Sequence, residues 1–272
     1  APGTHVNSTI QYSPAVDSEK IKNMISDQLV AGGFNEIWSN SLTRASYFEN
    51  LETFKAENTV NIYNPLSLDL NAMRQSLLFG GLEAILRNTN YQNPDLKLFE
   101  FGNTYFFKGK EELKSKVENY YEEMHLALFI TGKKRDENWI TPSENSTFFE
   151  LKSFVVAILK KLGFNLERLK IDSISNDILE EGLIYRRGDG KKFVEFGFVK
   201  ANLLKKAGIE NDVFYADFNW DFIIQQTINN KISYTELPKF PAVRRDLALL
   251  IDEAVTFSQL KEVAKRAEKT LL

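Results

Sequence analysis

The sequence predicts an α+β fold in which helices pack on one side of an antiparallel sheet. Two patterns carry this prediction. In some segments apolar residues recur at helical spacing between a capping residue and a glycine, and in others they alternate with polar residues at the period of a strand. With 272 residues, of which 43% are hydrophobic, the chain can bury one large core or two smaller ones.

The first predicted helix begins after Asp17, whose carboxylate can cap it, and ends at Gly32-Gly33. Its apolar residues share one face, so the helix is amphipathic. They are Ile21, Met24, Ile25 and Leu29. Residues 34–42 follow in an extended pattern. Residues 1–9 lack the basic start and apolar run of a signal peptide, and we expect residues 1–16 to form an N-terminal extension.

Residues 64–107 are predicted to form a loop, a helix and a strand. Asn64-Pro65 ends an extended segment, because the residue before a proline is excluded from the helical region. A helical apolar stripe follows, and from Lys97 the period changes to two. The stripe consists of Leu77, Leu78, Leu82, Ile85 and Leu86.

The middle of the chain alternates between strands and helices. Residues 108–119 are charged and predict an exposed excursion, and residues 125–131 predict a buried strand. Thr147 and Glu150 have the spacing of a capping box ahead of a helix that ends at Gly163.

Further along, a turn at Gly188-Asp189-Gly190 joins two extended segments into a hairpin. Residues 200–207 predict a short helix, and residues 213–222 predict another strand.

The last segment reads as the start of a separate domain. Residues 231–241 contain two prolines in a polar run and predict a linker, residues 246–252 predict a strand, and Thr256 with Gln259 predicts a capping box for a helix that reaches the last residue. One strand and one helix do not complete a domain, so we expect the chain to be cut inside it.

Four motifs carry a resemblance to a known family. They are Asn64-Pro65-Leu66-Ser67, Met73-Arg74-Gln75-Ser76-Leu77-Leu78, Asn93-Pro94-Asp95-Leu96-Lys97-Leu98-Phe99-Glu100-Phe101-Gly102 and Phe240-Pro241-Ala242-Val243-Arg244-Arg245-Asp246-Leu247-Ala248. In this order the chain resembles the beta chain of bacterial phenylalanyl-tRNA synthetase. The resemblance implies a non-catalytic core with a class II aminoacyl-tRNA synthetase-like fold over residues 17–235. It also implies a truncated, ferredoxin-like anticodon-binding domain over residues 239–272.

The sequence shows no residues that could bind ATP for the activation of an amino acid. Class II activation needs an arginine on the ATP α-phosphate and a second one on the γ-phosphate. Residues 103–107, where an active relative would place its arginines, are Asn, Thr, Tyr, Phe and Phe, and residues 215–222 have no glycine-rich turn that leads to an arginine. We therefore predict no catalytic residue. A stand-alone ligase that holds ATP through Arg74 or Arg87 remains an alternative.

Other candidate sites favour structural roles. His5 and His125 have no metal-ligand partner at useful spacing, so we predict no metal site. The carboxylate pairs Asp136-Glu137 and Glu180-Glu181 point to different faces and predict solvated charge. The glycines at residues 188–190 indicate a turn, since no Lys-Ser/Thr helix start follows.

Arg244 and Arg245 are the candidate nucleic-acid contacts. Paired arginines before a strand can place a guanidinium on a phosphate or an unpaired base. A salt bridge with Asp246 or Asp252 is the alternative. The net charge of −3 argues against a surface that coats RNA more widely.

The resemblance implies a scaffold role within an α2β2 enzyme. The alpha subunit would use ATP and magnesium to attach phenylalanine to tRNA(Phe), while this segment binds no cofactor itself. The face with Ile21, Met24, Ile25 and Leu29 would contact the alpha subunit, unless that helix packs only on its own sheet. A regulatory paralogue that binds another enzyme is a further alternative. The absence of cysteine and of any membrane-length apolar run predicts a cytoplasmic location.

Overall fold

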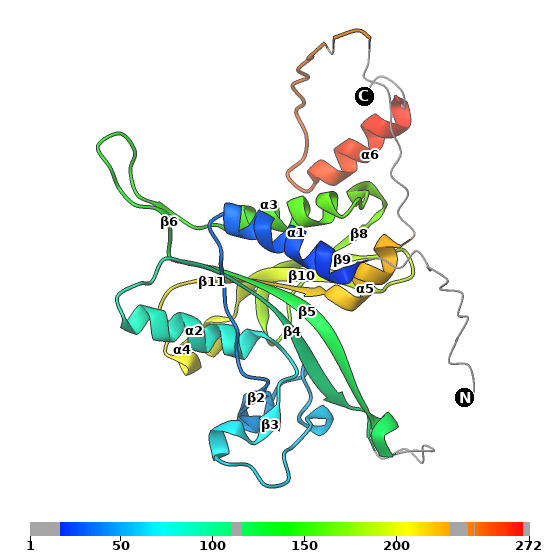
Figure 1. The fold of residues 1–272 in the computed structure, drawn as a ribbon. Helices are drawn as coiled ribbons and strands as arrows, with labels where there is room; N and C mark the ends of the chain where they lie inside the picture. The colour runs from blue at the N-terminus through cyan, green and yellow to red at the C-terminus, as the bar shows by residue number, and fades with distance from the viewer. Residues whose placement is uncertain (1–16, 110–115, 229–238, 242, 269–272) are drawn as a thin grey trace, which may run out of the picture. The chain divides into compact units, whose positions relative to one another are not determined.

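The computed structural model describes residues 17–109, 116–228, 239–241 and 243–268 (Figure 1). The chain divides into two compact units, Ala1–Ile232 and Ser233–Leu272. This division falls close to the expected linker. The predicted N-terminal extension lies outside the described residues.

A seven-stranded sheet forms the centre of the first unit, in the order β1-β4-β5-β11-β10-β9-β8. β1 pairs with β4 in parallel, and every other neighbouring pair in this sheet is antiparallel. The strands are β1 (Asn35–Glu36), β4 (Leu96–Phe107), β5 (Tyr120–Thr131), β8 (Lys170–Ile174), β9 (Leu179–Arg186), β10 (Lys192–Val199) and β11 (Val213–Asn219). The fold is therefore α+β, as predicted.

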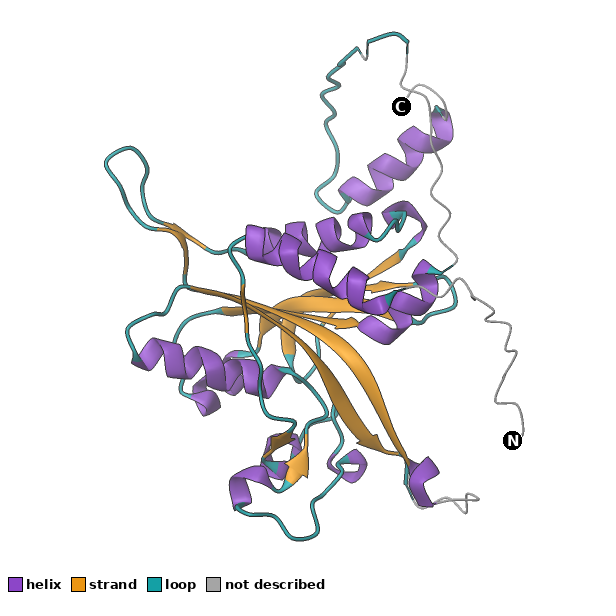
Figure 2. Ribbon diagram, in the orientation of Figure 1, coloured by secondary structure: helices purple, strands orange, loops and turns teal. Residues whose placement is uncertain are grey.

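Helices cover both faces of this sheet, so the prediction that they lie on one side is wrong (Figure 2). α1 (Ser18–Ala31), α3 (Phe148–Lys161) and α5 (Trp220–Thr227) pack on one face. α2 (Leu78–Asn90) and α4 (Ala201–Ala207) pack on the other. The central strands explain why. On β5, Leu128 enters the first core and Phe129 the second, so both faces are apolar and both must be buried.

The helix boundaries follow the predicted caps. Asp17 accepts a hydrogen bond from the Lys20 amide at 3.0 Å, and Thr147 accepts one from the Glu150 amide at 3.3 Å. α4 ends at Gly208, whose φ of 75° is the left-handed conformation that glycine adopts without strain.

β4 and β5 form a long two-stranded ribbon. They pair along their whole length, from Leu96 opposite Thr131 to Phe107 opposite Tyr120. Tyr105, Phe106 and Phe107 lie half-buried at its far end, where Phe106 stacks on Tyr121 with ring centroids 5.0 Å apart. The 3-10 helix η4 (Lys116–Asn119) precedes β5 in the predicted excursion.

Three local predictions need correction. Of residues 34–42, only β1 and the first residue of β2 (Leu42–Thr43) are strand, and β2 pairs with β3 (Ala72–Met73) in a separate ladder. The strand predicted over residues 213–222 ends at Asn219, because the Asn219 side chain caps α5 by accepting from the Phe222 amide at 2.9 Å. The sequence patterns also missed β8 and the short hairpin of β6 (Lys133–Arg135) and β7 (Glu144–Asn145).

The second unit contains α6 (Phe257–Ala267), which begins with the predicted capping box of Thr256 and Gln259. The helix ends at Ala267 and not at the last residue. Residues 246–252 are not a strand. Among the described residues of this unit they have no second strand to pair with, and an isolated strand leaves its backbone groups unbonded. A ferredoxin-like domain here stays a prediction.

Among the described residues, no helix combines the length and the apolar character that crossing a membrane requires.

Candidate functional site

Buried charges gather on the face of the sheet that α2 also covers. The register aligns Glu100 of β4, Asp217 of β11 and Glu195 of β10 in one row across the sheet. Their exposed fractions are 0%, 5% and 8%. A buried carboxylate is stable only when it is paired or hydrogen-bonded, so each of the three must have a partner.

The partner of Glu100 is Arg74, which precedes α2. Arg74 Nη1 lies 2.7 Å from Glu100 Oε1, and Arg74 Nε donates to the Asn103 carbonyl at 2.9 Å. Nη1 also donates to the Ser39 carbonyl at 3.3 Å, while the Ser39 hydroxyl donates to Glu100 Oε2 at 2.8 Å. With 5% of Arg74 exposed, its guanidinium is fully used inside the protein.

Gly102 makes room for this guanidinium. A Cβ at Gly102 would overlap the Arg74 side chain, whose position is fixed by its hydrogen bonds to Asn103, Ser39 and Glu100. The residues of the Phe-Glu-Phe-Gly motif at positions 99–102 thus include both the acid that pairs with Arg74 and the glycine on which Arg74 lies.

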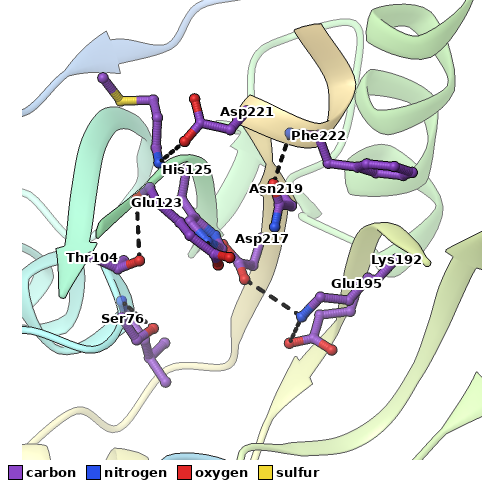
Figure 3. A network of polar contacts seen from close by, with 12 residues as sticks. Ser76, Thr104, Glu123, His125, Lys192, Glu195, Asp217, Asn219, Asp221 and Phe222 are labelled. Carbon is purple, nitrogen blue, oxygen red and sulfur yellow. Dashed lines mark hydrogen bonds and ion pairs between the residues drawn. The ribbon is translucent and has the colours of Figure 1, made fainter. Parts of the chain in front are cut away.

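A second cluster surrounds Asp217 (Figure 3). His125 Nδ1 lies 2.7 Å from Asp217 Oδ1, and Lys192 Nζ lies 3.9 Å from the other oxygen. Lys192 also pairs with Glu195 at 3.0 Å. His125 Nε2 is 3.6 Å from Glu123 Oε2, which is beyond hydrogen-bond range. The row of carboxylates is therefore neutralised by Arg74 ahead of α2, His125 of β5 and Lys192 of β10.

These pairings shift the pKa values of the cluster. Burial alone would lower the pKa of His125, but the charge and hydrogen bond of Asp217 outweigh burial and raise it to about 9. Burial would raise the pKa of Asp217, and the charge and hydrogen bond of His125 lower it instead. Burial would lower the pKa of Lys192, and Glu195 and Asp217 raise it. The proton thus stays on His125 at neutral pH.

In the part of the chain that the structure describes, the three cations beside the carboxylate row, Arg74, His125 and Lys192, are each paired with an internal carboxylate. Among the described residues, no group of three or more metal-ligating side chains meets. Arg74 precedes α2 and is paired with Glu100, whereas Arg87 lies exposed in the last turn of α2, at the opposite end of that helix. Arg74 and Arg87 therefore do not converge on one site, as two arginines that hold ATP would.

The residues proposed for a subunit interface pack on the chain's own core. Ile25 and Leu29 have no exposed surface, and Ile21 and Met24 are half-buried against the same core. These side chains agree with the alternative interpretation, in which the helix packs on its own sheet. A contact of Ile21, Met24, Ile25 and Leu29 with the alpha subunit stays a prediction.

Arg244 and Arg245 are both exposed in the second unit. Arg244 Nε lies 3.5 Å from Asp246 Oδ1, and both side chains are more than four-fifths exposed. The salt bridge foreseen as the alternative is present, and such an exposed pair contributes little to stability. Contact with RNA stays a prediction.

The carboxylate pairs and the glycine-rich segment, which were the remaining candidate sites, have positions that fit structural roles. Asp136, Glu137, Glu180 and Glu181 are exposed, and Gly188-Asp189-Gly190 is the turn between β9 and β10. His5 lies outside the described residues. The sequence reasoning missed Glu100, Asp217 and Lys192 as a network, although a charged residue inside an apolar strand was a visible signal for the first two.

The family comparison agrees with this geometry. The model of the phenylalanyl tRNA synthetase beta chain CLM domain matches residues 2–220. The chain belongs to the phenylalanyl-tRNA synthetase beta-chain family. It is 46% identical to the phenylalanine-tRNA ligase beta subunit of Bacteroides thetaiotaomicron over 271 residues, which are 99% of this chain and 33% of that protein. It is 38% identical to the Porphyromonas gingivalis beta subunit over 254 residues, 93% of this chain and 31% of the relative. The chain thus spans about a third of the length of these beta subunits.

Solved structures support the class II fold of this beta-chain segment. The crystal structure of pyrrolysyl-tRNA synthetase from Desulfitobacterium hafniense matches with a TM-score of 0.59 at 13% sequence identity. The match covers 79% of this chain and 71% of that one. At this identity the likeness concerns the fold alone.

Proposed function

We propose that this segment is a non-catalytic scaffold of a phenylalanine-tRNA ligase, in which an alpha subunit activates phenylalanine with ATP and magnesium. The observation that carries the proposal is the buried Arg74–Glu100 pair at 2.7 Å. A class II site needs arginines that reach phosphate, whereas this arginine is directed to an internal carboxylate. The family membership supports the ligase as the assembly.

The neighbouring charges support the same conclusion. Glu100, Asp217 and Glu195 form a row of buried carboxylates on the face of the sheet that α2 also covers. Arg74, His125 and Lys192 are already paired with them. A triphosphate placed here would have to displace these internal partners, at a cost of several kcal/mol for each buried charge left unpaired. This counts against a stand-alone ligase.

The outer side of α1 is the proposed contact with the alpha subunit. Asn23, Asp27 and Val30 are exposed there, and Val30 is 58% exposed. Between α1 and α3 lies an open groove of about 1160 Å³. The inner side of α1 is anchored in the core, so the outer side is held rigidly and can position a partner.

Two measurements on the full-length beta chain test the proposal. Light scattering behind size exclusion should show a stoichiometric complex with the alpha subunit, consistent with the α2β2 form. Phenylalanine-dependent pyrophosphate exchange should require the alpha subunit. Exchange by the beta chain alone would contradict the non-catalytic role, and the absence of any complex would contradict the scaffold role.

A matched pair of variants tests the interface. Asp27→Arg should weaken the complex at least about tenfold, because it changes a charge on the proposed contact surface. Glu137→Arg makes the same change of charge on the exposed loop between β6 and β7 and should leave the affinity unaltered. Equal affinities for both variants would remove α1 from the interface.

A further inference from the structure

β8 forms one edge of the seven-stranded sheet. Among the described residues it pairs with β9 alone. An edge strand directs about half of its backbone N–H and C=O groups away from its neighbour, and these groups can pair with a further strand. None of the five residues of β8 is a proline, so each N–H group on the outer side can donate a hydrogen bond.

The charged residues of β8 do not block this edge. Lys170 and Asp172 lie on the same face of the strand and pair with each other at 3.4 Å. Asp172 also lies 3.8 Å from Arg186 of β9. These charges are therefore compensated within the sheet.

The other face of β8 is partly apolar. Ile171 and Ser173 stand opposite Tyr185 and Leu183 of β9, which pack against the core that α3 covers. Residues that stand opposite each other direct their side chains to the same face, so Ile171 and Ser173 lie there too. Ile171 is 49% exposed. A strand added at this edge would cover it.

A cavity of about 570 Å³ lies on this same face, beside the end of β8. Phe148 of α3, Leu183 and Phe198 line it, and all three are half-buried. Phe148 and Phe198 stack with ring centroids 6.1 Å apart, so the cavity has a fixed apolar side. Ser173 of β8 also lines it. A residue paired opposite Ser173 on an added strand would therefore direct its side chain to the cavity.

The charge in the lining of this cavity is a carboxylate. Glu181 is exposed there, and within the described part of the chain its side chain has no ion pair or hydrogen bond. The lining includes no cation. Ser175, two residues after Ser173, lines the same cavity. A lysine or arginine opposite Ser175 would therefore find an uncompensated carboxylate within reach.

We propose that β8 and this cavity bind an extended peptide segment of another protein, which adds to the sheet as a further strand. Apolar side chains would lie opposite Ile171 and Ser173, and a lysine or arginine opposite Ser175. In such recognition the backbone hydrogen bonds supply affinity and the alternate side chains supply specificity. The site is separate from α1 and independent of the scaffold role, so failure of either proposal leaves the other unaffected.

Defined peptides test the proposal by calorimetric titration of the full-length beta chain. The probes are acetyl-Ser-Leu-Thr-Leu-Thr-Lys-Ser-amide and the peptide of reversed sequence, because a strand can add in either direction, and we expect one of them to bind. N-methylation of its five central residues should weaken binding at least about tenfold, since it removes the backbone donors. Exchanging its lysine for glutamate should weaken binding at least about fivefold. No detectable binding in either direction, or no effect of N-methylation, would overturn the proposal.

A matched pair of substitutions assigns the cation to the cavity. Glu181→Lys should reverse the preference, so that the glutamate peptide binds more tightly than the lysine peptide. Glu180→Lys makes the same change of charge at the neighbouring exposed residue, which is outside the lining, and should keep the preference for lysine. A preference for lysine that survives Glu181→Lys would overturn the assignment.

Hydrogen exchange locates the added strand. The amides of β8 that point away from β9 should exchange freely in the full-length beta chain and become protected when the peptide binds. Protection without the peptide would show that a second copy or another part of the longer chain already covers this edge, and would overturn the proposal. Protection by the peptide at other segments alone would overturn it as well.

Discussion

Arg74 is the cation that compensates the buried charge of Glu100. Replacing Arg74 by Met leaves Glu100 as an uncompensated buried charge, so we expect a loss of about 3–5 kcal/mol in the free energy of unfolding, measured by urea titration. Adding Glu100→Met to Arg74→Met should recover most of this loss, since the pair is then replaced by apolar groups. A double variant as unstable as the sum of the single variants would contradict the pairing.

His125 gives the protein a pH-dependent contribution to stability. Its pKa is about 9 in the folded protein against an ordinary value of 6.5, which corresponds to roughly 3 kcal/mol. Because the folded state holds the proton more tightly, this contribution is complete below pH 6.5 and is lost as the pH rises through 9. The difference in unfolding free energy between wild type and His125→Gln should shrink accordingly.

The chain's other histidine supplies the control for this prediction. We expect His5→Gln to leave the pH dependence between pH 6 and 10 unaltered, since among the described residues the histidine that pairs with Asp217 is His125. Measurements should stay above pH 5, where Asp217 with its lowered pKa remains ionised. A constant difference between wild type and His125→Gln over this range would contradict the raised pKa.

The charged residues of this network were only partly predictable from the sequence. His125 was expected to have a structural role, because no metal-ligand partner stands at a useful spacing. Its partner Asp217 is 92 positions away, and only the antiparallel pairing of β5 with β11 brings the two together. Long-range pairing of this kind leaves no local signal in the sequence.

At the scale of elements, α2 packs closely on the sheet at Gly81. A Cβ at Gly81 would overlap the ring of Phe129, which is fully buried on β5. Gly81→Ala should therefore lower the free energy of unfolding by about 1–2 kcal/mol, because overpacking outweighs the gain of up to about 1 kcal/mol in helix propensity.

A compensating variant separates packing from propensity at Gly81. Phe129→Leu makes room for the added methyl, so the double variant should be more stable than the sum of the two single changes. Gly188→Ala serves as the neutral comparison, since a Cβ there meets no atom within 4 Å. Additive effects of Gly81→Ala and Phe129→Leu would show that the two positions do not meet.

Elements with local signals were predicted well, and elements that depend on partners were not. The caps at Asp17, Thr147 and Thr256 located three helices, since a cap is a contact over three residues. The strand predicted over residues 246–252 failed, because the alternation of polar and apolar residues cannot show whether a second strand is present. The placement of helices on one face also failed, because periodicity does not show which face a helix covers.

At the scale of the whole molecule, we expect substitutions in the two units to have different effects. The first unit pairs the charges of its buried carboxylate row internally, whereas the second unit exposes Arg244 and Arg245. If the second unit contacts tRNA, its loss should affect tRNA binding and leave phenylalanine activation unchanged. The two functions of the ligase are then separable by substitution.

Charge reversal in the second unit tests this separation in the complete ligase. Arg244→Glu with Arg245→Glu should weaken tRNA binding by about tenfold or more and reduce the dependence of log K on log salt by about 1 to 2, because two phosphate contacts are lost. Phenylalanine-dependent pyrophosphate exchange should stay at the wild-type rate, since activation needs no contact with tRNA. The matched control is Lys265→Glu with Arg266→Glu on α6, which changes the net charge equally within the same unit. Equal losses in both double variants would indicate a general charge effect, and unchanged tRNA affinity in the first would exclude Arg244 and Arg245 from the tRNA contact.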